Sequence, residues 1–277
     1  MKFDAPKTVL CIHDLSCAGR AGLGAVLPAL AAMGCQPVAL PTAVLSTHTG
    51  GLGAPAALAC GAYGSAALAH YRQIGLQFDC IYTGYLPDEG ARRLACAAFD
   101  QWPGAFKLVD PVMGDGGRFY TALENSLEGM REVCRRADLI LPNLTEACFL
   151  LGKPLPEGPL EAPAAEALAA ELTGLCPDAV VTGLPMGKYV GVTGAGREKF
   201  LVRKLRLERN FPGTGDLFAA VLAGSLLRGN ALCAAADAAA ELVWQAINTT
   251  PPEADARLGA WFEPLLGRLA APGRSRV

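Results

Sequence analysis

Short apolar runs bounded by turn residues alternate along the chain with longer stretches rich in alanine and leucine. The runs are TVLCI (8–12), PVAL (37–40), CIYTG (80–84), FKLVD (106–110), LILP (139–142) and AVVTG (179–183). Continuously apolar strands that alternate with helices are typical of a mostly parallel sheet covered on both faces. We therefore expect a three-layer α/β/α sandwich. It would form one domain over residues 1–277, with a loose tail from about residue 271.

Two segments depart from this alternation. Residues 188–208 contain two alternating runs around a glycine-containing turn, which predicts an antiparallel hairpin at a sheet edge. Residues 216–228 and 232–247 have the composition of two packed helices, and Gly229-Asn230 is the predicted break between them. No repeat or low-complexity linker divides the chain.

The charge balance argues against several classes of function. The formal net charge of -2 gives no basic excess with which to bind nucleic acid. The N-terminal segment has no signal-peptide pattern, so we expect a cytoplasmic protein. Residues 21–71 contain no Asp, Glu, Lys or Arg, but prolines and glycines interrupt each candidate membrane span. We expect this segment to be buried in the core or in a subunit contact.

Cysteine and histidine residues are scattered rather than clustered. The chain contains 10 cysteines without a CxxC motif, and its 3 histidines, His13, His48 and His70, are dispersed as well. This spacing does not indicate a zinc site. We expect most of the thiols to be reduced core residues in a reducing cytosol.

Polar side chains follow the predicted strands. In a parallel sheet, ligands bind beyond the carboxyl ends of the strands, where side chains from separate segments meet. The polar residues at these positions are Asp14, Ser16, Tyr85, Asp110, Asp115, Asn143, Glu146 and Thr182. Their hydroxyl, carboxylate and amide groups should therefore gather at one edge of the sheet.

The segment PGTGDLFAA (212–220) places two glycines just before an aspartate at the start of a predicted helix. Glycines let the backbone approach a ligand and present its N–H groups at a helix N-terminus, which suits an anion. The helix dipole would stabilise a phosphoryl group in transfer, and Asp216 could accept a proton from an attacking hydroxyl. An isolated GxGD is more often a turn followed by a capped helix.

Two further motifs favour the chemical interpretation. DPVMGD (110–115) and PNLTE (142–146) each supply carboxylate and amide oxygens. Mg²⁺ suits such a site, because it binds through few protein ligands together with water and phosphates. Each motif alone could be an ordinary loop with a turn-forming Asp or Asn. Three such motifs at strand ends together favour a site for Mg²⁺ and a phosphate ester.

Together with IHDLSCAGRAG (12–22), STHTGG (46–51) and TGYLPD (83–88), these motifs resemble the ribokinase-type fold. Within that fold they are similar to the vitamin B6 kinases, that is, the pyridoxal and pyridoxamine kinases. The resemblance covers nearly the whole chain in order, and the GTGD block is its most specific part. It implies an ATP- and Mg²⁺-dependent kinase that phosphorylates the 5′-hydroxymethyl group of a vitamin B6 vitamer in salvage. It also implies a homodimer, and leaves a K⁺ requirement open.

The resemblance implies a role for each candidate residue. Asp216 would be the general base, and Gly213, Thr214 and Gly215 the anion hole. The substrate residues would be Asp14, Ser16, His48, Thr49 and Tyr85. The nucleotide residues would be Asp110, Asp115, Asn143, Thr182 and Gly213, and the metal residues Glu146, Asp115 and Asn143. Without the resemblance, His48 and Tyr85 could equally be packing residues and Thr182 a plain strand residue.

Arg118 and Tyr120, in the glycine-rich stretch after DPVMGD, could form a lid over ATP. An exposed loop arginine more often has no specific role. The cysteine-bearing lid of some bacterial family members is not evident. Leu141 stands where the family often has threonine, which affects one phosphate or monovalent-cation contact.

The identity of the substrate depends on two motifs that point in different directions. Asp14 stands where many vitamin B6 kinases have serine, and Asp14-Leu15-Ser16 is closer to the hydroxymethylpyrimidine kinases. STHTGG, however, resembles the SNHTG of pyridoxal kinases, and we let it decide. A hydroxymethylpyrimidine kinase and a non-catalytic pyridoxal phosphate-binding protein are the alternatives. The sequence lacks the P-loop, protein-kinase and Rossmann motifs, so those nucleotide-binding classes are disfavoured.

Overall fold

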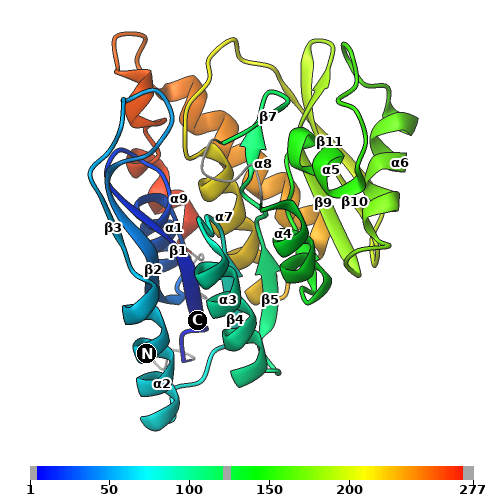
Figure 1. Ribbon diagram of the computed structural model, residues 1–277. Coiled ribbons are helices and arrows are strands. Elements are labelled where there is room, and N and C mark those ends of the chain that lie inside the picture. The colour runs from blue at the N-terminus through cyan, green and yellow to red at the C-terminus, as the bar shows by residue number, and fades with distance from the viewer. Residues whose placement is uncertain (1–4, 121–125, 271–277) are drawn as a thin grey trace, which may run out of the picture.

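Within residues 5–120 and 126–270, which the computed structural model describes, nine strands form one central sheet (Figure 1). In order across the sheet they are β11 (Phe200–Leu205), β10 (Tyr189–Ala195), β9 (Asp178–Met186), β8 (Leu139–Ile140), β5 (Phe106–Val109), β4 (Cys80–Thr83), β1 (Thr8–Ala18), β2 (Gln36–Thr47) and β3 (Ala57–Ala59). The pairs from β2 across to β9 are parallel. This confirms the mostly parallel sheet expected from the six apolar runs.

The antiparallel strands lie at the two edges of the sheet. β10 pairs antiparallel with β9 and with β11, which confirms the predicted hairpin at a sheet edge. β3 pairs antiparallel with β2 at the opposite edge. A separate two-stranded sheet, β6 (Gly114–Asp115) with β7 (Arg118–Phe119), follows β5 and was not predicted.

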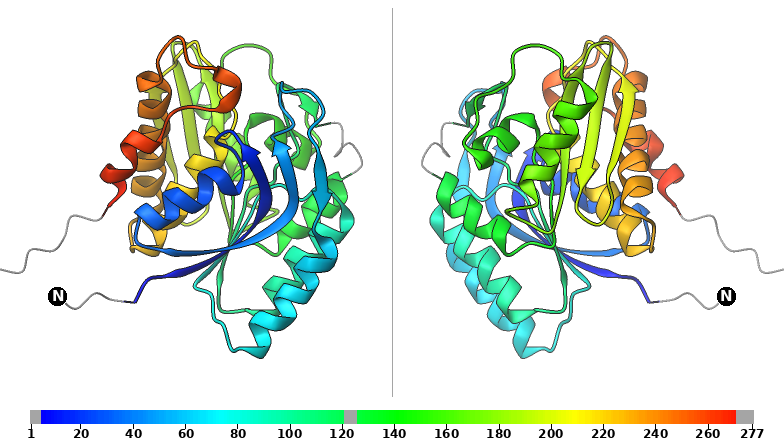
Figure 2. Two further views of the ribbon diagram at one scale, coloured as in Figure 1. Left: turned by 90° about the vertical axis from the view of Figure 1, so that its left-hand side faces the viewer. Right: turned by 90° about the vertical axis from the view of Figure 1, so that its right-hand side faces the viewer.

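Helices cover both faces of the sheet, and Figure 2 shows the three layers edge-on. One face is covered by α1 (Leu23–Ala32), α7 (Thr214–Leu227), α8 (Leu232–Thr249) and α9 (Leu266–Leu269). The other face is covered by α2 (Gly61–Gln73), α3 (Glu89–Gln101), α4 (Leu127–Arg135), α5 (Leu144–Leu151) and α6 (Ala162–Leu172). The short 3-10 helices η2 (Ala256–Leu258) and η3 (Glu263–Leu265) precede α9. The α/β/α sandwich is therefore confirmed.

Each face of the sheet has its own hydrophobic core, and β1 contributes to both. Leu10 and Ile12 belong to the core under α2–α6, whereas Val9 and Cys11 belong to the core under α1, α7 and α8. All four are 0% exposed. A strand buried on both faces has apolar side chains at successive positions, which is why the run was continuous rather than alternating.

The remaining expectations from the sequence concern the two long C-terminal helices, the cysteines, the charge-poor segment and the tail. α7 and α8 are the two predicted helices, and Gly229, with φ 85°, joins them. All ten cysteines are free thiols, and most of them are buried. The charge-poor segment 21–71 is only partly buried, in α1 and the middle of β2, whereas β3 and much of α2 are exposed. No helix among the described residues is long and apolar enough to cross a bilayer. The predicted tail at 271–277 lies outside the described residues.

Candidate active site

The glycine turn before α7 is shaped by its contact with the loop that follows β1. Gly213 has a φ of 77°, in the left-handed region, and stands at the N-cap of α7. A Cβ atom added at Gly213 would overlap the carbonyl oxygen of Arg20, whereas one added at Gly215 meets no atom within 4 Å. Gly213 therefore allows the turn to pack against residue 20, and Gly215 borders open space.

Asp216 lies in the first turn of α7, and its carboxylate interacts with the other end of the chain. Its Oδ2 accepts a hydrogen bond of 2.6 Å from the N–H of Gly22, and its Oδ1 lies 2.9 Å from Nε2 of His13. The side chain is 13% exposed. Helix capping, the ordinary role of an aspartate in a GxGD segment, does not describe these contacts. They place the carboxylate between the start of α7, the middle of β1 and the loop that follows β1.

His13 links Asp216 to Asp14, and it is a site residue that the sequence analysis did not single out. Its Nδ1 lies 2.8 Å from Oδ1 of Asp14, whose Oδ2 accepts a hydrogen bond of 2.7 Å from the Ser16 hydroxyl. The signal in the sequence was its position next to Asp14 at the end of an apolar strand. The four side chains form one buried hydrogen-bonded series.

Charge pairing sets the protonation of this series. Burial alone would lower the pKa of His13, but the carboxylates of Asp216 and Asp14 raise it to about 10. Burial alone would raise the pKa of Asp14, but the hydrogen bond and charge of His13 hold it below its ordinary value. The neighbouring carboxylates therefore favour the protonated form of the His13 ring.

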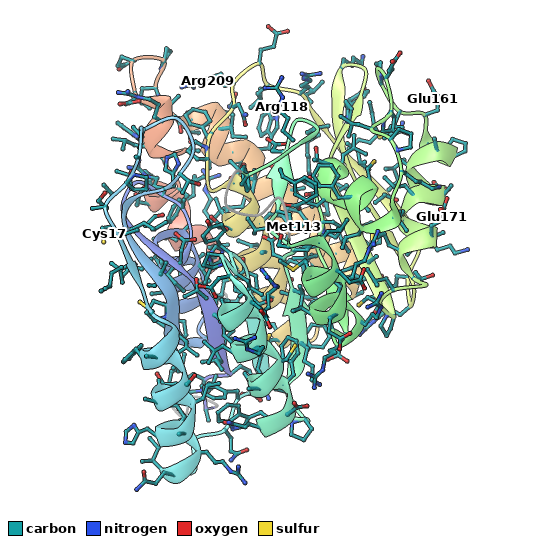
Figure 3. The ribbon with its side chains drawn as sticks, in the orientation of Figure 1. Cys17, Met113, Arg118, Glu161, Glu171 and Arg209 are labelled. Atoms are coloured by element: carbon teal, nitrogen blue, oxygen red, sulfur yellow. The ribbon has the colours of Figure 1, made fainter. Side chains whose placement is uncertain are left out.

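Asn143 and Glu146 hold the DPVMGD loop against the start of α5. The Glu146 carboxylate accepts hydrogen bonds of 2.9 Å from the backbone N–H groups of Met113 and Asn143, and the Asn143 side chain accepts one from the Glu146 N–H and donates one to Gly114 O. This is a capping box that also bridges to a second loop. Figure 3 shows Met113 in the interior of the molecule, and it is 0% exposed.

Buried carboxyl groups extend from this loop toward Asp216. Burial, and then the negative charge of Asp216, raise the pKa of Asp110 to about 7. Burial and the charge of Asp110 raise the pKa of Glu146 well above its ordinary value. Burial and the charges of nearby carboxylates, among them those of Glu146, Asp110 and Asp216, also raise the pKa of Tyr120. The structure thus brings the GTGD, DPVMGD and NLTE motifs to one edge of the sheet.

The other predicted nucleotide and lid residues are more open. Asp115 is exposed and accepts a hydrogen bond of 2.8 Å from the Gly116 N–H. Thr182, at the end of the buried part of β9, bridges to Asn143 in the backbone and is half-buried. Arg118 is exposed on β7, and Figure 3 shows it at the same end of the molecule as Arg209.

The predicted substrate residues from STHTGG and TGYLPD lie in different surroundings. His48 is buried, with Nε2 donating to Arg257 O at 2.6 Å and Nδ1 accepting from the Gly50 N–H at 3.0 Å. Both ring nitrogens therefore hold the fold together, which is the packing role left open by the sequence. Thr49 is exposed and Tyr85 is half-buried, with its N–H 3.4 Å from His13 Nδ1.

The α/β/α fold, with the glycine turn of α7 and the carboxyl groups at the strand ends, fits an ATP-dependent small-molecule kinase of ribokinase-like fold, and comparison with known kinases supports that class. The chain matches the model of the phosphomethylpyrimidine kinase family over residues 16–264 and belongs to that family. The family and its relatives are kinases, so the non-catalytic alternative is not supported.

Named relatives and solved structures agree with this class. The chain is 30% identical over 243 residues to the pyridoxine/pyridoxal/pyridoxamine kinase of Bordetella avium, covering 84% of this chain and 81% of that one. Its fold matches pyridoxal kinase from Lactobacillus plantarum with a TM-score of 0.88 and 31% identity, over 95% of this chain and 96% of that chain. It matches a provisionally named phosphomethylpyrimidine kinase from Bacteroides thetaiotaomicron, solved with pyridoxal, with a TM-score of 0.90 and 33% identity, over 95% and 96%.

The two glycines of the turn should respond differently to a methyl group. Gly213→Ala should lower the free energy of unfolding by about 2 kcal/mol or more, because alanine disfavours positive φ and its Cβ would overlap Arg20 O. Gly215→Ala, inside α7, should leave stability unchanged or raise it by up to about 1 kcal/mol. Urea denaturation measures both changes. Equal losses in the two variants would contradict this account of the turn.

Asp110 should make stability depend on pH. The folded protein keeps a proton on Asp110 up to about pH 7, whereas the unfolded chain, with an ordinary pKa of 3.8, loses it much earlier. The stability that the protonated form contributes is therefore lost progressively as the pH rises above 3.8, and it is fully lost once the pH passes through about 7. Asp110→Asn should therefore stabilise the protein above about pH 7, by at most about 4 kcal/mol, since one pKa unit corresponds to about 1.4 kcal/mol. The gain should shrink as the pH falls toward about 4.

Urea denaturation of wild type and Asp110→Asn across this pH range measures the difference. Asp115→Asn, which changes an exposed carboxylate of the same loop, is the matched control. A pH-independent difference between Asp110→Asn and wild type would show that Asp110 does not titrate as described.

Proposed function

We propose that this kinase transfers the γ-phosphoryl group of ATP to the 5′-hydroxymethyl group of pyridoxal, pyridoxamine or pyridoxine. The observation that carries the proposal is the Asp216 carboxylate, held beside the glycine turn of α7 by Gly22 N–H and His13. The name of the Bordetella avium relative and the pyridoxal in the Bacteroides thetaiotaomicron structure support the choice of substrate. A role in vitamin B6 salvage follows from that chemistry.

In this proposal the protein aligns the two substrates and removes one proton. Asp216 accepts the proton of the alcohol as the alcohol oxygen attacks the γ-phosphorus, while the bond from that phosphorus to the bridging oxygen breaks and ADP leaves. The backbone N–H groups of Gly213, Thr214 and Gly215, with the dipole of α7, stabilise the charge on the transferring phosphoryl group. Gly213 and Gly215 suit this role because neither carries a side chain that would cover the N–H groups.

The chemistry of the acidic side chains fits magnesium held mainly by phosphates and water. Among the described residues, no three Asp, Glu, His or Cys side chains form a metal cluster. Both Glu146 oxygens already accept backbone hydrogen bonds, so Glu146 and Asn143 suit an indirect role through water. Asp115, exposed at the same edge, is the carboxylate best placed to meet the metal. When bound, Mg²⁺ would neutralise charge on the phosphates of ATP.

Two groups of residues would form the two ends of the site, one for the substrate and one for the nucleotide. Thr49 and Tyr85 would contact the pyridine ring, whereas buried Asp14, Ser16 and His48 would shape the pocket from behind. Thr182, Asp110 and Asn143 would lie toward the nucleotide, with Arg118 and Tyr120 as its cover. The whole chain would act as one kinase domain.

The alternative substrate is hydroxymethylpyrimidine, favoured by the name of the matching family and by Asp14 and Ser16. We expect kcat/KM for at least one vitamin B6 alcohol to exceed that for hydroxymethylpyrimidine by about tenfold or more, a ratio that pocket contacts can supply. ATP-coupled assays with the alcohols in parallel measure these values. A preference of similar size for the pyrimidine would overturn the substrate assignment and leave the kinase chemistry intact.

Removal of the proposed base should separate chemistry from binding. Asp216→Asn should lower kcat by about 100- to 10,000-fold, the usual contribution of a positioned general base. The affinities for ATP and pyridoxal, measured by calorimetry, should stay close to wild type. Glu128→Gln, an exposed change on α4, controls for a carboxylate-to-amide substitution. If Asp216→Asn keeps about a tenth or more of the wild-type kcat, Asp216 is not the general base.

We also propose a cytoplasmic homodimer that buries the exposed part of the charge-poor segment. Leu58 on β3 is 64% exposed and Tyr63 on α2 is 56% exposed, and both lie in that segment. Apolar side chains in a region without charges are typical of the centre of a subunit contact. Sedimentation velocity measures the state, and a monomer at micromolar concentration would contradict the dimer. Activity with K⁺ in place of Na⁺ tests the open question of a monovalent cation.

A further inference from the structure

We propose that His13 is a positioning residue for phosphoryl transfer. Its ring holds two carboxylates in fixed positions relative to each other, that of the general base Asp216 and that of Asp14 on the substrate side. The inference rests on the proposed role of Asp216 as the base. His13 would not contact the substrate itself. It would set the place from which Asp216 meets the alcohol.

The geometry leaves the His13 ring little freedom. Its side chain is 3% exposed, and its two nitrogens lie 2.9 Å from Asp216 Oδ1 and 2.8 Å from Asp14 Oδ1. A Cβ atom added at Gly84 would overlap Cδ2 and Nε2 of the ring. Gly84 directly follows β4, so the strand next to β1 keeps the space for the imidazole open. The ring is therefore held by contacts from β1, from α7 and from the segment after β4.

Groups from each packed element face this ring. Asp14 comes from β1, Asp216 from α7 and Asp110 from the segment after β5, and the charges of Asp110 and His13 interact. The ring of Tyr82, from β4, has its centroid 5.9 Å from that of His13. The N–H of Tyr85 lies 3.4 Å from Nδ1. These neighbours supply mostly negative charge, which favours a proton on each nitrogen that meets a carboxylate.

The bond to Asp216 does not depend on the protonation of the other nitrogen. Two groups of Asp14 lie near Nδ1 of His13. The Asp14 N–H, at 2.9 Å, can donate to Nδ1 only if Nδ1 carries no proton. The Asp14 carboxylate oxygen, at 2.8 Å, can accept from Nδ1 only if Nδ1 carries a proton. In the first case the neutral ring has its proton on Nε2, and in the second the ring has both protons. In both cases Nε2–H donates to the Asp216 carboxylate.

A base held from two sides has a defined direction. The Gly22 N–H fixes Oδ2 of Asp216 and the His13 ring fixes Oδ1. The same ring is anchored through Asp14 to the Ser16 hydroxyl, and Asp14 and Ser16 are two of the proposed substrate residues. A change at His13 should therefore alter the alignment of the base, which affects the chemical step, more than it affects ground-state binding.

The test compares two amide substitutions with similar polarity and different reach. The His13→Gln side chain is long enough to place an amide N–H near the position of Nε2, whereas the His13→Asn side chain reaches only the position of Nδ1. We expect kcat to fall by about 10- to 100-fold in His13→Asn, since a misplacement of about 1 Å can cost about 100-fold. His13→Gln should recover part of that loss. KM for pyridoxal and for ATP should change by less than about threefold in both, because binding contacts are kept.

One control variant and the Asp216→Asn enzyme make the outcome unambiguous. His70→Gln, on the exposed face of α2, controls for loss of a histidine, and thermal denaturation checks that each variant is folded. If His13→Asn and His13→Gln have equal kcat values, whether reduced or not, the positioning role is wrong. If Asp216→Asn keeps wild-type kcat, the failure lies in the base assignment, and the two failures are thereby distinguished.

Discussion

The contact of the start of α7 with the middle of β1 and with the loop after β1 organises the site. Asp216 and His13 are 203 positions apart in the chain, yet their side chains meet at 2.9 Å. Gly213 lets the turn before α7 pack onto residue 20, and the loop from 20 to 22 then presents the Gly22 N–H to the same carboxylate. A helix N-terminus that would otherwise be a simple anion site thus acquires a fixed acid–base group.

The second constraint is the amount of buried negative charge at this edge of the sheet. Asp14 is stabilised by His13, and the charge of Asp216 is shared between His13 and a backbone N–H. Asp110 differs, since burial and the charge of Asp216 raise its pKa to about 7. A triphosphate would be repelled by such carboxylates unless its charge were neutralised, which is a physical reason to expect ATP to enter as its magnesium complex. The proposed general base and the proposed magnesium complex therefore both follow from the carboxylates that gather at this edge of the sheet.

Local patterns in the sequence were sufficient for the layers and for the motifs. Strands buried on both faces gave continuous apolar runs, and the edge hairpin gave alternating ones, so a mostly parallel sheet with an antiparallel hairpin at one edge could be anticipated. The order of the strands and the antiparallel β3 at the other edge could not. The ends of the strands were harder, because β1 continues to Ala18 through the polar residues His13, Asp14 and Ser16. These side chains hydrogen-bond to one another and, through His13, to Asp216, so the strand continues there without the apolar composition of its first half.

His13 and His48 show why the rest could not be predicted. In the sequence they were two dispersed histidines, and their partners, Asp216 and the Arg257 carbonyl, lie about 200 positions away. Contacts over such separations depend on the packing of the whole sheet and leave no local period. The exposure of β3 could not be predicted for a related reason, because a segment without charged residues has the same composition whether the protein core or a second subunit covers it.

A crystal structure of the protein with pyridoxal and a non-hydrolysable ATP analogue tests the central claim most directly. The account predicts the hydroxymethyl oxygen within hydrogen-bond reach of an Asp216 oxygen, at about 2.6–3.2 Å. It also predicts the terminal phosphate at the N–H groups of residues 213–215. An alcohol oxygen beyond the reach of Asp216, directly or through one water, and beside another proton acceptor would contradict the account.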